Sequence, residues 1–373
     1  MKSIGIITIH KINNYGSVLQ AFALQKACED FGYEVEIIDY NFPNDFHADH
    51  KYLTKGDTQP NEPKWIKIIY ALALMRQHKG IRAFVDKYQH LSANQYNSPE
   101  ELKVNAPKYD IYITGSDQLW NPRHCGGDPA FLLHFAPDNA KKISYAASMC
   151  ADKLPEELVG LYRTLLGRYT DISVRENSSI RVIKELTDKD ATNVVDPTLL
   201  LNRDQWNEIA FKKRIIKKKY VLCYFLNYTF NAFPYVDKLA AYIQDKTGYK
   251  IVRVARPPHQ LCMAHTQFEI GASPEEFLAL VRDAEMVLTT SFHGTAFAVN
   301  YGRPVFTVVK DKAASDSRQV NLMHHLGLDE QILSIGDAMP EQSRFLYDEN
   351  KEQLRLETLR QKSLIFLKTA LKK

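Results

Sequence analysis

Short apolar runs alternate with segments of helical period along most of the chain. Residues 4–9 form an apolar run, and residues 17–31 place leucine, phenylalanine and alanine close to a helical spacing. Gly32 follows this helical segment, and residues 33–40 (YEVEIIDY) alternate between apolar and polar positions. A strand, a helix and a second strand in this order are typical of the start of a doubly wound α/β fold.

The alternation is interrupted at residues 43–108. This stretch is polar, contains GDTQPNEP and continues with two segments of helical character, WIKIIYALALMRQ and KGIRAFVDKYQHL. An insertion of this sort in a sheet protein usually forms a lid or a wall that selects the substrate. We therefore predict a helical insertion at about 43–108 that forms the acceptor side of the first domain.

The α/β pattern resumes after the insertion, and the basic stretch KKRIIKKK (212–219) marks the boundary between two halves that share it. The sequence predicts an α/β protein of two Rossmann-like domains that resembles the glycosyltransferase-B architecture. We expect an N-terminal domain at 1–205 and a C-terminal domain at 206–350. A basic amphipathic helix at 351–373 could cross back to the N-terminal domain.

The composition narrows the class of protein. Of the 373 residues, 45% are hydrophobic and 25% are charged, which is ordinary for a globular protein, and a net charge of +4 is too small to argue for nucleic acid. No run of about 18 apolar residues predicts a transmembrane helix, and the strand-like start does not resemble a signal peptide. Five scattered cysteines predict reduced thiols in a cytoplasm.

The turn HKINNYGSVLQ (10–20) is the first candidate binding site. Asn14, Gly16 and Ser17 lie where backbone N–H groups at the start of a helix could receive an anion; the alternative is a turn that Asn14 or Ser17 caps. The turn lacks G-x-G-x-x-G, so we expect no nicotinamide cofactor. HQLCMAH (259–265) has a metal-like spacing but lacks a second pair of ligands, so we expect no metal.

The motif TGSDQLWNP (114–122) places small and polar residues at the end of a predicted strand. Gly115 would let a ligand approach the backbone, and Ser116 could donate a hydrogen bond to it. Asp117 could accept a proton from a sugar hydroxyl, and Trp120 offers a flat face for stacking on a sugar ring. The alternative is an aspartate that caps the turn and a tryptophan in the core.

Two arginines are candidates for binding an anion. Arg175 lies near the end of an otherwise apolar strand, and a buried arginine is costly unless it meets an anion. Its planar fork suits a carboxylate or a phosphate; the alternative is a salt bridge to Glu176 or to another internal acid. Arg318 lies near the start of a helix in the second half and could bind phosphate or lie on the surface.

The segment TTSFHGTAFAVNYGRP (289–304) places His293 in the turn between a buried strand and a helix. Such turns lie at the carboxyl edge of a parallel sheet, where open α/β folds bind ligands. A histidine there can give and take a proton near neutral pH; the alternative is a structural histidine that binds the backbone of the turn. Ser291, Gly294 and Thr295 surround it and are candidate substrate contacts.

Several motifs, in this order, resemble the polysaccharide pyruvyl transferase family over nearly the whole chain. They are NNYGSVLQAFALQKA, YDIYITGSDQLWNP, ISYAAS, DISVREN, VVDPTLLL, VLTTSFHGTAFAVNYGRP and SRQVNLMHHLGL. Members of the family resemble glycosyltransferase-B enzymes in shape and move the enolpyruvyl unit of phosphoenolpyruvate onto a sugar, commonly as a cyclic pyruvate ketal. The resemblance implies phosphoenolpyruvate as the donor substrate and a galactose-type, lipid-linked or polysaccharide-precursor acceptor in surface polysaccharide biosynthesis, with no further cofactor.

The candidate residues have roles in that chemistry. Arg175 and Arg318 would clamp the anionic donor, and His293 would protonate its vinyl carbon. Asp117 would act as a base or would orient the sugar. The family often carries an arginine where this chain has Ser291. The missing charge could come from Arg318, Arg175, Lys310 or Lys312.

Two other functions fit the same pattern. A nucleotide-sugar glycosyltransferase would share the basic groups but would need a nucleobase pocket in the second half. A non-catalytic relative would keep the fold and would bind an anion or a glycan without transferring a group. We expect a cytoplasmic protein without a nucleic-acid partner, whose basic segments 212–219 and 351–373 could rest on the inner membrane surface.

Overall fold

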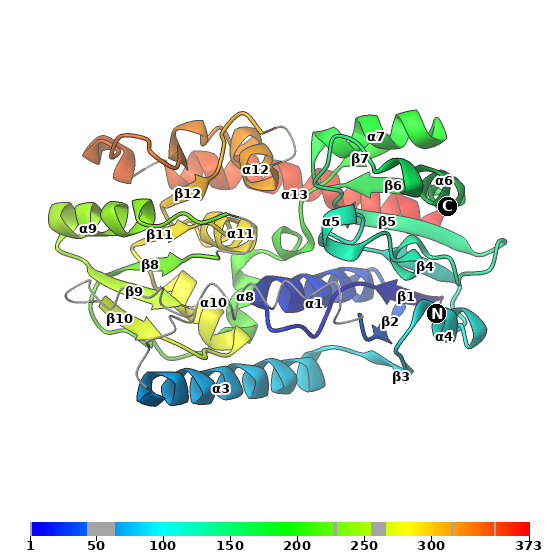
Figure 1. Cartoon of the computed structure of the whole chain (residues 1–373), viewed down its shortest axis with the longest axis horizontal. Helices are drawn as coiled ribbons and strands as arrows, with labels where there is room; N and C mark the ends of the chain where they lie inside the picture. The colour runs from blue at the N-terminus through cyan, green and yellow to red at the C-terminus, as the bar shows by residue number, and fades with distance from the viewer. Residues whose placement is uncertain (1, 43–63, 227–229, 255–265, 315–316, 347) are drawn as a thin grey trace.

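The computed structural model describes residues 2–42, 64–226, 230–254, 266–314, 317–346 and 348–373, and these form two lobes around two parallel sheets (Figure 1). Helices cover the sheets in both lobes. The alternation of strands and helices read from the sequence therefore gives the predicted α/β fold with two Rossmann-like halves.

The first sheet, which forms the N-terminal lobe, has the strand order β3-β2-β1-β4-β5-β6-β7, and all its pairs are parallel. Its strands are β1 (Ser3–Ile7), β2 (Glu34–Tyr40), β3 (Leu91–Tyr96), β4 (Ile111–Thr114), β5 (Lys141–Ala147), β6 (Asp171–Val174) and β7 (Ala191–Asn193). Its helices are α1 (Tyr15–Asp30), α3 (Lys64–Tyr88), α4 (Pro99–Val104), α5 (Pro122–Cys125), η2 (Pro129–Leu132), α6 (Glu156–Leu166), α7 (Asn177–Thr187) and η3 (Pro197–Leu199). The first six strands follow the order typical of a Rossmann fold.

The second sheet, which forms the C-terminal lobe, repeats this order as β10-β9-β8-β11-β12-β13, again parallel throughout. Its strands are β8 (Tyr220–Tyr224), β9 (Lys250–Val254), β10 (Thr266–Glu269), β11 (Met286–Thr289), β12 (Val305–Val309) and β13 (Ile332–Ser334). The helices of this half are α8 (Arg203–Ile209), α9 (Tyr235–Thr247), α10 (Pro274–Arg282), α11 (Phe292–Asn300), α12 (Arg318–Leu326), η4 (Asp329–Gln331), η5 (Gln342–Phe345) and α13 (Glu349–Lys372).

The region expected as a helical insertion is built differently from that expectation. The two helical segments form one helix, α3, and the polar run LSANQY after it is β3, which pairs with β2 at the edge of the first sheet. Gly80 does not break α3; a Cβ placed there would lie 2.9 Å from the Cβ of Ser273, so the glycine allows close packing on the other lobe. Residues 43–63 lie outside the described residues.

Several contacts join the two lobes. The hydroxyl of Tyr15 in α1 donates to the carbonyl oxygen of Ala272 at 2.8 Å, and its ring stacks on Phe277 with centroids 4.6 Å apart. The long helix α13 packs on α11 and α12 and then runs along the N-terminal lobe, where Ser363 accepts a hydrogen bond from the N–H of Val195 at 3.0 Å (Figure 1). No helix in the described ranges combines the length and the apolar character needed to cross a membrane.

Candidate active site

The candidate residues gather where strands of both sheets end. The strand order reverses between β1 and β4 in the first sheet and between β8 and β11 in the second. Open α/β sheets bind ligands at such points, outside the carboxyl ends of the strands. Asp117 follows β4 and His293 follows β11, and the two side chains interact electrostatically. The two lobes therefore form one shared site.

The start of α1 fits closely against His293 of the other lobe. Asn14 caps the helix, and its side chain accepts hydrogen bonds from the N–H groups of Gly16 at 2.9 Å and Ser17 at 3.4 Å. A Cβ placed on Gly16 would lie 2.0 Å from Nδ1 of His293, so only glycine leaves room for the ring. Because Asn14 already satisfies these two N–H groups, the helix start supports the site mainly by packing against the histidine.

Asp117 is the carboxylate that links the two lobes. It is buried, and its φ of 81° lies in the left-handed region that residues other than glycine rarely adopt and that often marks functional sites. The hydroxyl of Ser17 donates to Oδ2 at 2.7 Å. Burial would raise the pKa of Asp117, but nearby cations and the Ser17 hydroxyl outweigh it and hold that pKa well below its usual range. The nearby cations are Arg175 and Arg318, and the ring of His293 contributes in the same direction.

Arg175 connects two buried carboxylates. Its Nη1 lies 2.6 Å from Oδ2 of Asp196, and its Nη2 lies 3.5 Å from Oδ1 of Asp117. Glu176, the other acid considered as a partner, instead accepts a hydrogen bond from the N–H of Met149 at 2.8 Å. Arg175 thus forms an internal salt bridge, and an anionic substrate would have to share its guanidinium group with these two carboxylates.

Asp196 is a site residue that the sequence reasoning did not single out. It lies after β7 in the motif VVDP, where two buried valines and not an apolar strand precede the acid. Its Oδ1 accepts hydrogen bonds from the N–H and the hydroxyl of Thr198 at 3.0 and 2.7 Å. Burial would raise the pKa of Asp196, but the facing His293 and Arg175 outweigh it and hold that pKa well below its usual range.

His293 presents one ring nitrogen to this carboxylate. Its Nε2 has no hydrogen-bond partner among the described residues and lies 3.7 Å from Oδ2 of Asp196, which is longer than a hydrogen bond. The neighbouring ring of Phe292 lies 4.8 Å from Cζ of Arg175 and 5.3 Å from Cζ of Arg318, within the range of cation–π contacts. The histidine nitrogen therefore lies beside a carboxylate, with two guanidinium groups close by.

A small cavity of about 60 Å³ opens at this cluster. Arg175, Asp196 and Arg318 contribute to its wall, together with His325 and Lys362. Arg318 also reaches toward Asp117, with 3.8 Å between Nη1 and Oδ1. The cavity thus brings several cationic or protonatable groups to one place, which suits a small anion.

Two predicted ligand contacts are wrong, because both residues belong to the core. Trp120 has no exposed surface, and its indole N–H donates to the carbonyl oxygen of Phe131 at 3.0 Å, so it cannot stack on a sugar. A Cβ on Gly115 would lie 2.0 Å from the carbonyl oxygen of Tyr145, and the close approach at this glycine is therefore made by β5 and not by a ligand.

The small polar residues of the two turns also serve the fold. Ser116 is fully buried and donates to the carbonyl oxygen of Ala146 at 2.8 Å. Ser291 caps α11 and accepts from the N–H of Gly294 at 3.3 Å, while the fully buried Thr295 donates to the carbonyl oxygen of Ser291 at 3.1 Å. These groups shape the segment that holds Asp117 and the start of α11, where His293 lies, and their hydrogen bonds within the protein argue against the predicted contacts with substrate.

Of the cations expected to compensate for Ser291, both arginines lie at the site. Lys312 pairs with Asp337 at 2.5 Å, and Lys310 is exposed. Within the described ranges, no group of three or more histidine, cysteine or acidic residues is arranged to hold a metal ion. The motif at 259–265 lies outside the described residues.

Solved structures with this fold include several sugar-nucleotide enzymes. The chain superposes on a putative UDP-N-acetylglucosamine 2-epimerase from Listeria monocytogenes with a TM-score of 0.54 and 10% identity, covering 98% of this chain and 90% of that one. An S. aureus MnaA–UDP complex gives a TM-score of 0.52 and 12% identity over 96% and 90% of the two chains. At these identities the likeness shows the fold alone.

The sequence comparison gives a family. No curated protein matches the chain significantly. The model of the polysaccharide pyruvyl transferase family matches residues 14–311, which include most of the residues at the site and most of the chain. The chain is therefore a transferase that belongs to the polysaccharide pyruvyl transferase family.

Proposed function

We propose that this protein transfers the enolpyruvyl group of phosphoenolpyruvate to a sugar and closes a pyruvate ketal across two hydroxyls. The observation that carries the proposal is the convergence on one site between the lobes of Arg175, Arg318 and Nε2 of His293, which has no hydrogen-bond partner among the described residues. Phosphoenolpyruvate has a phosphate and a carboxylate next to a vinyl group. Two guanidinium groups and a proton donor are the functional groups that such a substrate requires.

In the proposed reaction, His293 donates a proton from Nε2 to the vinyl CH2 carbon, which becomes a methyl group. Asp196, 3.7 Å away, stabilises the protonated imidazole before this transfer. The neighbouring carbon becomes oxocarbenium-like, and the first sugar hydroxyl attacks it. Phosphate then leaves, and the second hydroxyl closes the ring. One of the two hydroxyl protons replaces the proton that His293 gave, and the other leaves with the phosphate.

Asp117 fits the orienting role better than the role of base. Its depressed pKa makes the carboxylate a weak proton acceptor, and Ser17 and Arg175 already hold it in place. In this scheme it orients the guanidinium groups and accepts a hydrogen bond from the sugar. Arg318 holds the donor anion, and Arg175 contributes through the charge that it shares between Asp117 and Asp196.

The test is phosphate release from phosphoenolpyruvate in the presence of lipid-linked galactosides. We expect His293→Gln to lower the rate by about 10²–10⁴, the usual contribution of general acid catalysis. His324→Gln is the matched control, because that histidine has a 72% exposed side chain and pairs with Asp329. Full turnover in His293→Gln would contradict the assigned acid. UDP, which MnaA binds, is the competing ligand: turnover of a UDP-sugar in place of phosphoenolpyruvate would favour glycosyl transfer.

A further inference from the structure

The helix α3 exposes apolar side chains on the face that points away from the core. Its second half buries Ile81, Phe84 and Val85. On a helix of 3.6 residues per turn, Ile68, Leu72 and Met75 lie on the opposite face. These three side chains are 60%, 60% and 66% exposed, whereas the outward face of a surface helix is normally polar. Figure 1 shows α3 along one outer edge of the molecule.

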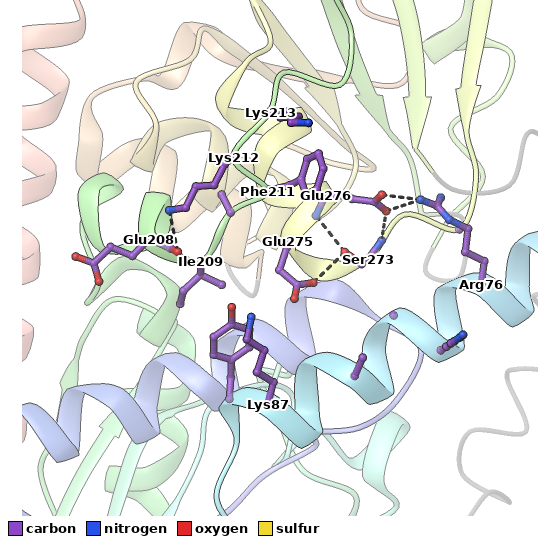
Figure 2. Close-up of a pocket in the computed structure, with 16 residues that line it drawn as sticks. Arg76, Lys87, Glu208, Ile209, Phe211, Lys212, Lys213, Ser273, Glu275 and Glu276 are labelled. Atoms are coloured by element: carbon purple, nitrogen blue, oxygen red, sulfur yellow. Dashed lines mark hydrogen bonds and ion pairs between the residues drawn. The ribbon is translucent and has the colours of Figure 1, made fainter.

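Further along α3, beginning at Arg76, an open hollow of about 750 Å³ lies where α3 meets α8, α10 and the segment after α8, and the three apolar residues precede it without lining it. Figure 2 shows the residues that line the hollow, among them Lys87 and Arg76 from α3, with Lys212 and Lys213 from the facing segment. Phe211, which is 44% exposed, adds an apolar side chain to the same wall.

The charge around this hollow is positive. Its lining has five cations, Arg76, Lys79, Lys87, Lys212 and Lys213, and three acids, Glu208, Glu275 and Glu276. Arg76 and Glu276 neutralise each other, because Glu276 accepts from Arg76 at 2.6 and 2.8 Å. The four lysines of the lining then face only Glu208 and Glu275, so the hollow keeps an excess of positive charge.

We propose that Ile68, Leu72, Met75 and the lysines of the hollow, together called the α3 surface, dock this protein on an anionic lipid bilayer. An exposed apolar stripe flanked by lysines is the combination that holds a helix in the plane of a membrane interface. The apolar side chains enter the boundary between headgroups and acyl chains, and the lysines meet the lipid phosphates. A second copy of the chain fits less well, because a symmetric dimer through this surface would gather positive charge from both copies in one interface.

The inference does not depend on pyruvyl transfer, because it concerns binding to lipid and not turnover. It does place the enzyme at the surface where a lipid-linked acceptor would be found. Loss of vesicle binding with intact turnover would contradict this inference alone, and loss of turnover with intact vesicle binding would contradict the proposed function alone.

The first test is flotation of the full chain with vesicles of phosphatidylglycerol and phosphatidylcholine, compared with phosphatidylcholine alone. The wild type should float with the anionic vesicles, and added salt should release it. We expect Ile68→Ser/Leu72→Ser/Met75→Ser to lose at least about tenfold in partitioning. The control is Val104→Ser/Ile335→Ser/Leu346→Ser, whose three residues are 81%, 40% and 76% exposed outside α3 and α13 and which should float normally.

The second test removes charge. Lys79→Ala/Lys213→Ala should lose about fivefold per lysine in partitioning on anionic vesicles. Lys238→Ala/Lys246→Ala on α9 removes the same charge from another face and should have little effect. The proposal is overturned if the wild type does not bind anionic vesicles. It is also overturned if the triple serine variant and Lys79→Ala/Lys213→Ala float as much as their controls. It is also overturned if light scattering shows a dimer that the triple serine variant dissociates, since a second copy would then cover the α3 surface.

Discussion

Replacing Asp196 with asparagine should destabilise the protein by about 3 kcal/mol. The substitution keeps the shape of the side chain and its bonds from Thr198, but it removes the charge that faces Arg175 at 2.6 Å. Both side chains are essentially inaccessible to water, and removing one partner of a buried ion pair typically costs about 3–5 kcal/mol. Asp117 remains 3.5 Å from the same guanidinium group, so we expect the lower end of that range.

Urea denaturation monitored by tryptophan fluorescence measures this loss as a change in the free energy of unfolding. Asp30→Asn is the matched control, because Asp30 pairs with Lys26 on the surface, where both side chains are more than 40% exposed. An exposed pair of this kind contributes at most about 1 kcal/mol. If Asp196→Asn destabilised the protein no more than Asp30→Asn, the buried charge cluster would not stabilise the site as described.

Three further variants test other parts of the site. Gly16→Ala should displace the His293 ring, because its Cβ would lie 2.0 Å from Nδ1; we expect a fall in kcat and a loss of about 1–3 kcal/mol in stability, measured by steady-state kinetics and urea denaturation. Asp117→Asn should be less stable than the wild type at neutral pH. The pKa of Asp117 is depressed in the folded protein, so the charged carboxylate stabilises the fold. This stabilisation should be complete above a pH of about 3.9, the pKa of an aspartate in the unfolded chain, and should shrink as the pH falls below that value. Urea denaturation curves taken at a series of pH values measure it. Trp120→Phe should lose about 1–3 kcal/mol with the hydrogen bond to Phe131 but keep its KM for the sugar, whereas a raised KM would support the stacking role rejected above.

The parts of the fold that follow a strong pattern could be predicted from the sequence. Apolar strands followed by amphipathic helices gave both Rossmann-like halves. The rule that ligands bind at carboxyl edges placed Asp117 after β4 and His293 after β11, although His293 lies in the first turn of α11 and not in the turn before it. The edge strand β3 could not be predicted in this way, because its alternation is weak and three of its six residues are exposed. The two helical segments of the insertion did not show that they join in one helix, since the reason for Gly80 inside α3 is its close packing against Ser273 on the other lobe.

The site was harder to predict than the fold, because it depends on contacts between distant parts of the chain. Trp120 and Asp117 lie in one motif, yet the first belongs to the core and the second to the site, since the left-handed backbone at Asp117 turns the chain between them. Asp196 was missed because its role depends on Arg175 and His293, and the sequence does not show that the three meet. The partner of Arg175 could be anticipated as an internal acid, but not which acid.

The most direct test of the proposed donor is calorimetric titration of the protein with phosphoenolpyruvate, with Arg318→Gln as the test variant. Arg181→Gln, which changes an arginine whose side chain is 62% exposed on α7, is the control. We predict saturable binding of phosphoenolpyruvate to the wild type and to Arg181→Gln, and a dissociation constant roughly 10- to 100-fold higher for Arg318→Gln, since a hydrogen bond to a charged group contributes about 1.5–3 kcal/mol. Saturable binding of UDP with no binding of phosphoenolpyruvate would contradict the account.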